Sequence, residues 1–140
     1  MTNEFVSPVR SIPYPQEKIY AVLSDLTNLE KVKDRIPVDK VQDFEFDKDS
    51  CSFSVNPVGK VRFSIVDREA PKTIKFAGEQ LPVQVNLWIQ LKEVQPDDTK
   101  LKLTVKADLN PFLKPMLSKP LQDGVNKMAD VLAAIPYGEL

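Results

Sequence analysis

The residue types that most often carry out catalysis are scarce in this chain. Its 140 residues include no histidine and a single cysteine, Cys51. A Ser-His-Asp triad, a Cys-His pair, a histidine general base, a zinc site with histidine ligands and an intrachain disulfide are therefore excluded. No Walker or GxGxxG sequence is present and only four residues are glycine, so a loop that cradles nucleotide phosphates is not supported. We expect neither a cofactor nor a metal.

Carboxylates and tyrosines remain as candidates. Asp25 follows the apolar stripe of the first expected helix. A carboxylate pushed into an apolar mouth would have a raised pKa and act as an acid or base, whereas a carboxylate at a helix junction would accept hydrogen bonds from nearby amides. Tyr14, Tyr20 and Tyr137 could donate a hydrogen bond to a polarised carbonyl, or pack in the core with a satisfied hydroxyl.

Three further features have a chemical and a structural interpretation. Arg62 would bind an anionic head group if it faced inward, but the alternation of its strand directs it to solvent. Cys51 has no histidine to activate it, so we predict an unreactive thiol. Alternating acids could attract a hard cation, or form a solvated edge that resists unwanted strand pairing, which is the interpretation we favour. These acids are Asp43, Glu45, Asp47 and Asp49.

Length and charge limit the class of protein. A chain of 140 residues fits one domain, and we find no repeat or long linker, so we predict a single domain over residues 1–140. Nineteen Lys and Arg residues nearly balance twenty Asp and Glu residues, giving a net charge of −1 that disfavours a nucleic-acid partner. No apolar run approaches the roughly 20 residues that span a bilayer. Without a signal-like N-terminus, we expect a cytoplasmic protein; its oligomeric state is not predicted.

The chain begins with a strand and two short helices. Val9–Ile12 is typical of the end of a strand, and Pro15 stands at or near the first position of a helix that should end close to Leu26. Thr27 precedes Glu30 by three residues, the spacing of a capping box, and predicts a second short helix. That helix cannot continue past residue 35, because Pro37 follows.

The middle of the chain, from Val38 to Asp108, has the two-residue period of β-strands. Short alternating segments are separated by turn residues at intervals typical of hairpins, so the pattern predicts an antiparallel sheet. The most regular alternation is that of Val85, Leu87, Ile89 and Leu91. Trp88 lies between these positions and is expected on the outer face of the sheet.

The last segment returns to a helical period. Apolar residues recur there at spacings of three and four, which predicts a long amphipathic helix. This stripe consists of Leu117, Leu121, Val125, Met128 and Leu132. Because Pro115 and Pro120 fall near its beginning, we expect a start or kink there and a continuous helix from about Leu121 to Ala134.

This order of elements resembles the helix-grip fold of the START-like superfamily (SRPBCC proteins), which includes polyketide cyclase/dehydrase-like, lipid-transport and Bet v 1-like proteins. The local resemblance lies in the run Pro15, Ile19-Tyr20, Leu23, Ser24-Asp25-Leu26 and Asn28-Leu29. The resemblance implies an α+β domain in which a curved antiparallel sheet of about six or seven strands wraps round a long C-terminal helix. It also implies a cavity between sheet and helix that accepts a hydrophobic or amphipathic small molecule, without specifying a reaction.

We therefore predict binding or transport of a small hydrophobic ligand, such as a lipid or a polyketide-like molecule, with no cofactor. The residues expected to line the cavity, or else to fill a solid core, are Phe44, Phe46, Phe53, Phe63, Phe76, Leu87, Ile89, Leu103, Val105, Met116, Met128 and Leu132. Two alternatives remain. One is a cyclase or dehydrase that uses a carboxylate and a tyrosine in the cavity. The other is a protein-interaction module whose cavity has collapsed and whose outer face around Trp88 meets a partner.

Overall fold

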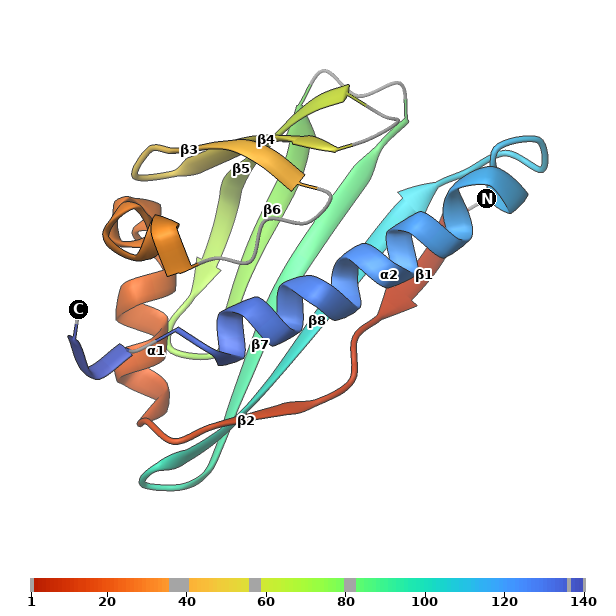
Figure 1. The fold of residues 1–140 in the computed structure, drawn as a ribbon. Coiled ribbons are helices and arrows are strands. Elements are labelled where there is room, and N and C mark those ends of the chain that lie inside the picture. Colours follow the sequence, from red (N-terminus) through yellow and green to blue (C-terminus); the bar gives the residue numbers. More distant parts are fainter. Residues whose placement is uncertain (1, 36–40, 56–58, 80–82, 136, 140) are drawn as a thin grey trace.

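The computed structural model describes residues 2–35, 41–55, 59–79, 83–135 and 137–139 (Figure 1). The strands are β1 (Thr2–Val6), β2 (Arg10–Ile12), β3 (Val41–Phe46), β4 (Ser50–Val55), β5 (Gly59–Glu69), β6 (Thr73–Glu79), β7 (Val85–Gln95) and β8 (Asp98–Asp108). The helices are α1 (Gln16–Leu23), the 3-10 helix η1 (Leu26–Arg35), α2 (Lys114–Ala133) and the 3-10 turn η2 (Tyr137–Glu139). The chain thus follows the predicted order of strand region, short helices, strands and long helix.

All the strands belong to one antiparallel sheet, in the order β1-β8-β7-β6-β5-β4-β3, with β2 also paired to β8. The N-terminal strand predicted from the sequence is divided into two strands, β1 and β2. The pairing with β8 stops at Val6 and resumes at Arg10. Ser7 occupies this break: its amide donates to the Leu103 carbonyl and its hydroxyl accepts from the Leu103 amide, both at 2.9 Å. The serine side chain thereby takes the place of a backbone partner.

The predicted alternation separates an apolar inner face from a polar outer face. Val85, Leu87, Ile89 and Leu91 of β7 are all buried. Their counterparts on β8 are buried too, and these residues form part of the core. Trp88 lies half-buried on the opposite face, where the ammonium groups of Lys75 and Lys106 stand 5.3 and 5.4 Å from the centre of its ring. Two lysines therefore contact the tryptophan on this face.

Helix α2 starts earlier than the prolines suggested. It runs unbroken from Lys114 to Ala133, with Pro115 in its first turn and Pro120 inside it. In the first turn a missing amide hydrogen costs nothing, since the first amides of a helix have no partner within it. Pro120 removes the donor for the carbonyl of Met116, a residue that is 61% exposed. Water can satisfy that carbonyl. Of the start or kink expected near the prolines, the start was placed too late, because the helix already begins at Lys114.

One long side of α2 is fastened to the edge of the sheet. The Arg10 guanidinium on β2 pairs with Asp130 at 2.6 Å, and the Gln122 amide donates to the carbonyl of Val6 at 2.9 Å. Figure 1 shows α2 crossing the sheet obliquely, with α1 and η1 at one end and the β3–β4 hairpin arching toward it. In the described part of the chain, no helix is long and apolar enough to cross a lipid bilayer.

Tyr137 secures the end of α2. Its ring is fully buried and meets Tyr14 edge to face, with the ring centres 5.9 Å apart. Its hydroxyl donates to the carbonyl of Leu132 at 2.6 Å. The residue four positions after Leu132 is proline, which has no amide hydrogen to complete the helical bond. The tyrosine hydroxyl therefore supplies the donor that the backbone lacks.

Replacing Tyr137 with phenylalanine should lower the free energy of unfolding by about 1–2 kcal/mol, because the buried Leu132 carbonyl loses its donor while the packing is retained. Urea denaturation followed by circular dichroism measures this change. Tyr14→Phe is the matched control, since the Tyr14 hydroxyl makes no hydrogen bond to the described residues, and it should change stability by less than about 0.5 kcal/mol. Equal losses in the two variants would show that the Tyr137 hydroxyl has no special role.

Candidate ligand-binding cavity

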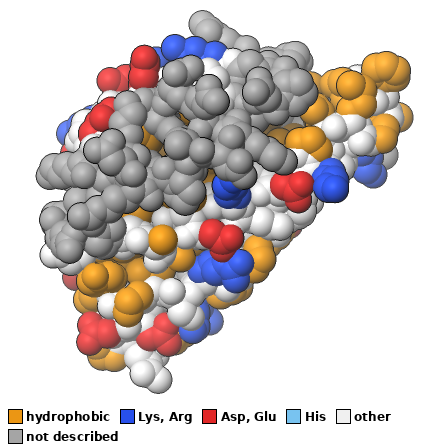
Figure 2. All heavy atoms as spheres, in the orientation of Figure 1, with side chains coloured by type: hydrophobic (Ala, Val, Ile, Leu, Met, Phe, Trp, Pro, Cys, Tyr) orange, Lys and Arg blue, Asp and Glu red, His pale blue; other side chains and the backbone are white. Residues whose placement is uncertain are grey.

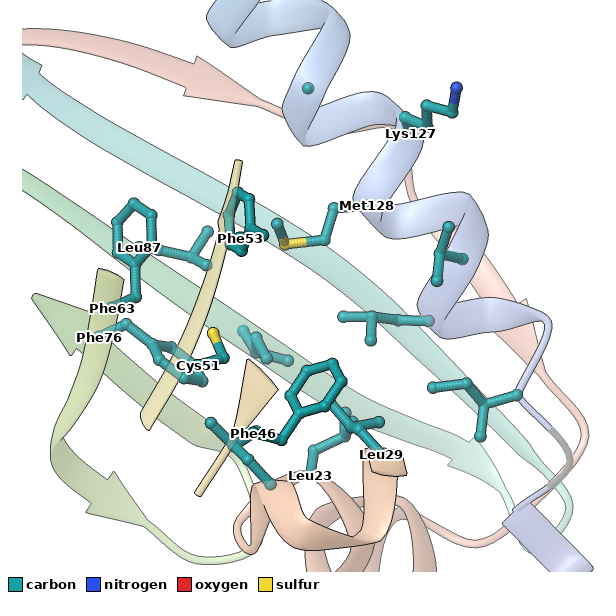
Figure 3. A pocket seen from close by; sticks show the side chains of 16 residues that line it. Leu23, Leu29, Phe46, Cys51, Phe53, Phe63, Phe76, Leu87, Lys127 and Met128 are labelled. Carbon is teal, nitrogen blue, oxygen red and sulfur yellow. The ribbon is translucent and has the colours of Figure 1, made fainter. Parts of the chain in front are cut away.

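A cavity of about 150 Å³ lies between α2, η1 and the inner face of the sheet (Figure 3). Its lining is almost wholly apolar. The sixteen lining residues are Leu23, Leu26, Leu29, Phe46, Cys51, Phe53, Phe63, Phe76, Leu87, Ile89, Gly124, Lys127, Met128, Val131, Leu132 and Ile135. An apolar space of this size is large enough to accept a small apolar guest. The collapsed-cavity alternative requires side chains to fill this space, and the described side chains leave it open.

Eight of the twelve residues expected to line a cavity do line it. They are Phe46, Phe53, Phe63, Phe76, Leu87, Ile89, Met128 and Leu132. Six of them alternate inward on β3 to β7, and two come from the apolar stripe of α2. Phe53 and Phe63 stack across β4 and β5, with ring centres 6.1 Å apart and planes inclined by 17°. One wall of the cavity is therefore aromatic.

The other four residues lie elsewhere. Leu103 and Val105 are buried on β8, the strand that α2 covers, and do not reach the cavity. Met116 is exposed because it stands one position away from the inward stripe of α2, which includes Leu117. Phe44 belongs to β3, and its side chain lies outside the described residues. The alternation of apolar residues predicted which residues face the interior of the fold. It did not predict which of these residues α2 leaves uncovered, so that they line the cavity.

Half of the lining was not anticipated. Leu23, Leu26 and Leu29 come from α1 and η1, where their spacing of three marks them as one face of a helical turn. A second group comes from α2 and consists of Gly124, Lys127, Val131 and Ile135. These residues recur at spacings of three and four, next to the predicted apolar stripe of α2. The sequence pattern did not reveal them, because glycine and lysine are not apolar residues. Cys51 completes the set.

A hydrogen-bonded junction positions the leucines of η1. The Arg68 guanidinium donates to the Ser24 carbonyl at the end of α1, at 2.9 and 3.2 Å, and also pairs with Asp49. The amide of Leu26 donates to the carbonyl of Lys48 at 3.0 Å. These contacts join α1, the β3–β4 turn and β5, so they set where the chain enters η1 and where Leu26 faces the cavity.

Asp25 is a capping residue of this junction. Its carboxylate accepts hydrogen bonds from the Thr27 hydroxyl at 2.6 Å and the Thr27 amide at 3.1 Å. The hydrogen bond from the Thr27 hydroxyl is the main reason that the pKa of Asp25 lies below its usual value. Asp25 does not line the cavity. The structure therefore supports the capping interpretation, with Asp25 in place of the expected Thr27 as the cap.

The three candidate tyrosines and Arg62 also lie outside the cavity lining. Burial raises the pKa of the Tyr20 and Tyr137 hydroxyls further above neutrality, so neither is prepared to act as a base. Arg62 is exposed, where its guanidinium pairs with Glu79 at 3.1 Å and donates to the Ser50 hydroxyl at 3.1 Å. None of the described lining residues is an aspartate, a glutamate or a tyrosine.

The acidic run along β3 and its turn is paired with cations. Glu45 lies 3.9 Å from Lys60, Asp47 lies 3.8 Å from Arg62, and Asp49 pairs with Arg68. The side chain of Asp43 lies outside the described residues. Among the residues with described side chains, no three histidine, cysteine, aspartate or glutamate groups come together as a metal site would require.

Two lining residues carry polar atoms in their side chains. Burial raises the pKa of the Cys51 thiol to about 11, so the thiol is neutral at physiological pH. Figure 3 shows the Lys127 side chain extending away from the other labelled residues, with its nitrogen at the far end. The stem of Lys127 therefore lines the cavity while its charge lies outside, as long cationic side chains commonly arrange themselves.

Solved structures with the same architecture are numerous. Norcoclaurine synthase from Thalictrum flavum superposes with a TM-score of 0.73 at 13% identity, over 95% of this chain and 92% of the other. A START superfamily protein from Mycobacterium smegmatis gives 0.67 at 12% identity, over 94% of each chain. A protein from Thermus thermophilus gives 0.65 at 20% identity, again over 94% of each. No family model and no curated sequence matches the chain significantly.

The chain has the helix-grip fold. The predicted likeness to START-like and Bet v 1-like proteins is thus confirmed for the architecture, including the curved antiparallel sheet and the long C-terminal helix. At identities of 20% or less, these likenesses concern the fold and not the activity.

The position of Cys51 gives a test of the cavity environment. At about pH 8, iodoacetamide should alkylate the folded protein roughly 100-fold more slowly than an ordinary thiol, because a pKa near 11 leaves very little thiolate. The rate should rise about tenfold per pH unit until the thiol ionises. Mass spectrometry follows the reaction at this single cysteine, with urea-unfolded protein as the control. Folded protein that reacts as fast as the unfolded chain would mean that Cys51 is not buried as described.

Proposed function

We propose that this protein binds a small apolar molecule, about the size of a single aromatic ring, in the cavity between α2, η1 and the sheet. The observation that carries the proposal is an unfilled space of about 150 Å³ whose lining is almost entirely apolar. Binding would be driven by the transfer of apolar surface out of water, at about 25 cal/mol per Å² buried. The protein would hold or carry the molecule in the cytoplasm, the compartment that its single cysteine favours.

The volume argues for a smaller ligand than a lipid. Cavities that enclose drug-sized ligands usually measure about 300–1,000 Å³, whereas an apolar cavity of about 150 Å³ is large enough for benzene. A long acyl chain would fit only if α2 or η1 moved away from the sheet. The stacked rings of Phe53 and Phe63 and the thioether of Met128 favour an aromatic guest, because aromatic rings and sulfur make favourable contacts with one another.

A structural neighbour supports this ligand class. Norcoclaurine synthase, at 17% identity and a TM-score of 0.69, was solved in complex with dopamine and hydroxybenzaldehyde, each of which has one aromatic ring. A comparable ligand in the present cavity would meet no carboxylate or tyrosine among the described lining residues. The cyclase or dehydrase alternative needs such a pair, so we base the proposal on binding alone.

The natural ligand is best sought in protein purified from the cells that make it. Native mass spectrometry should detect a complex whose added mass corresponds to a small molecule, and chromatography of the denatured sample would identify it. Protein that is consistently empty, and that also fails to bind the probe described next, would refute the proposal.

Gly124, an exposed residue at the edge of the cavity, provides a variant that should narrow the cavity without damaging the fold. A Cβ atom built on this residue meets no other atom within 4 Å, although the residue lines the cavity. Replacing glycine within a helix also gains about 0.5–1 kcal/mol in helix propensity. Gly124→Leu should therefore unfold at an equal or higher urea concentration than the wild type. Toluene, a single-ring probe, should shift the methyl NMR signals of Leu87, Ile89 and Leu132 in the wild type, and Gly124→Leu should weaken its binding at least about tenfold.

The control for this prediction is Asp123→Ala, at an exposed neighbouring position. It raises helix propensity as well but adds nothing to the cavity lining. Asp123→Ala should bind toluene as the wild type does. If Gly124→Leu bound toluene with unchanged affinity, the probe would lie elsewhere and the cavity would not be the binding site.

A further inference from the structure

Two large apolar side chains are exposed close together in the sequence, where the chain enters α2. Phe112 is 76% exposed and Met116 is 61% exposed, more than any other large hydrophobic residue whose side chain is described. The other exposed large hydrophobic residues in that set are all valines. Phe112 lies in the turn just before α2 and Met116 lies in the first turn of the helix, so both project from the same end of α2. Figure 2 shows hydrophobic side chains gathered at the projecting end of the molecule, where Figure 1 places the start of α2.

A hydrogen-bonded turn precedes α2 and contains Phe112. The side-chain oxygen of Asn110 accepts hydrogen bonds from the amides of Phe112 and Leu113, at 2.9 and 2.8 Å. Leu113 and Leu117 pack against the core from the opposite side of the helix start. With their neighbours anchored in this way, Phe112 and Met116 project outward.

The same segment is positively charged. Residues 109–122 contain two lysines, Lys114 and Lys119, and no acidic residue, although the whole chain has a net charge of −1. Both lysines are exposed. The nearest acids along the chain, Asp108 and Asp123, lie on either side of the segment. Exposed apolar side chains with flanking cations are the combination that peripheral proteins use to bind anionic membranes.

We propose that the start of α2 docks on the surface of an anionic lipid bilayer. Phe112 and Met116 would enter the boundary between head groups and acyl chains, while Lys114 and Lys119 would lie among the phosphate groups. The contact is peripheral and involves no spanning helix. It does not depend on the cavity ligand, because it uses the opposite half of α2 from the cavity residues, which begin at Gly124.

The shape and charge of the segment favour a bilayer over other occupants. A second copy docked symmetrically on the same patch would bring two positively charged patches together, which is unfavourable. A folded protein partner would need a pocket shaped to receive two projecting side chains. A bilayer needs no such pocket, since its interior adapts to the inserted groups.

The test is sedimentation with vesicles of phosphatidylcholine containing about one third phosphatidylserine, compared with pure phosphatidylcholine. The wild-type protein should bind the anionic vesicles more strongly. The double variant Phe112→Ser with Met116→Ser should lose on the order of tenfold or more in partition coefficient, since the inserted apolar surface is removed. Lys114→Gln with Lys119→Gln should lose roughly 30-fold on anionic vesicles and little on neutral ones.

Matched controls separate this patch from general surface effects. Val66→Ser with Val94→Ser removes two exposed apolar side chains elsewhere, and Lys72→Gln with Lys92→Gln removes two exposed charges elsewhere. Both controls should bind as the wild type does. Urea denaturation should show that the Phe112 and Met116 variant is as stable as the wild type, because neither side chain is buried.

Two results would overturn the proposal. The first is wild-type protein that binds anionic vesicles no better than its Phe112 and Met116 variant. The second is a dimer, seen by light scattering in the absence of vesicles, that the same variant dissociates, since the patch would then belong to a contact between two copies. Neither result bears on toluene binding in the cavity, which is measured separately.

Discussion

The structure depends on how one helix covers a much wider sheet. Seven strands side by side span roughly 29 Å at the usual spacing of about 4.8 Å, whereas a helix with its side chains is only about 10–12 Å across. Helix α2 packs mainly on β8, β1 and β2, at one edge of the sheet. Arg10 and Gln122 hold it there through their bonds to Asp130 and Val6. The inner face of the remaining strands must therefore be covered by other means, by curvature of the sheet and by α1 and η1.

The cavity follows from this geometry. The inward residues of β4 to β7 are too far from the seat of α2 to be packed closely against it, and η1 covers them from one end only. The position of η1 depends on the polar junction in which Arg68 joins the Ser24 carbonyl to Asp49. A polar contact on the outside of the fold thus determines how near Leu26 and Leu29 approach Phe46 and Cys51 across the cavity.

The sequence predicted the elements well because each has a strong period. The alternation around Leu87 and the stripe around Val125 identified the apolar faces without any structural information. What the sequence lacks is the lateral position of α2. Ile89 and Leu103 have the same pattern and face the same way, yet only Ile89 reaches the cavity, because Leu103 lies on the strand that α2 covers. Met116 illustrates a second limit of sequence-based prediction. It is exposed although Leu117, the next residue along the helix, packs against the core.

Two features of the lining indicate that the space is retained at a cost to stability. The first is an apolar space of about 150 Å³ that the described side chains leave open, so its lining lacks the packing contacts of a closed core. The second is Gly124, because almost any other residue would stabilise α2 and a Cβ atom would meet nothing within 4 Å. The local sequence thus leaves this space open at the expense of packing and of helix propensity.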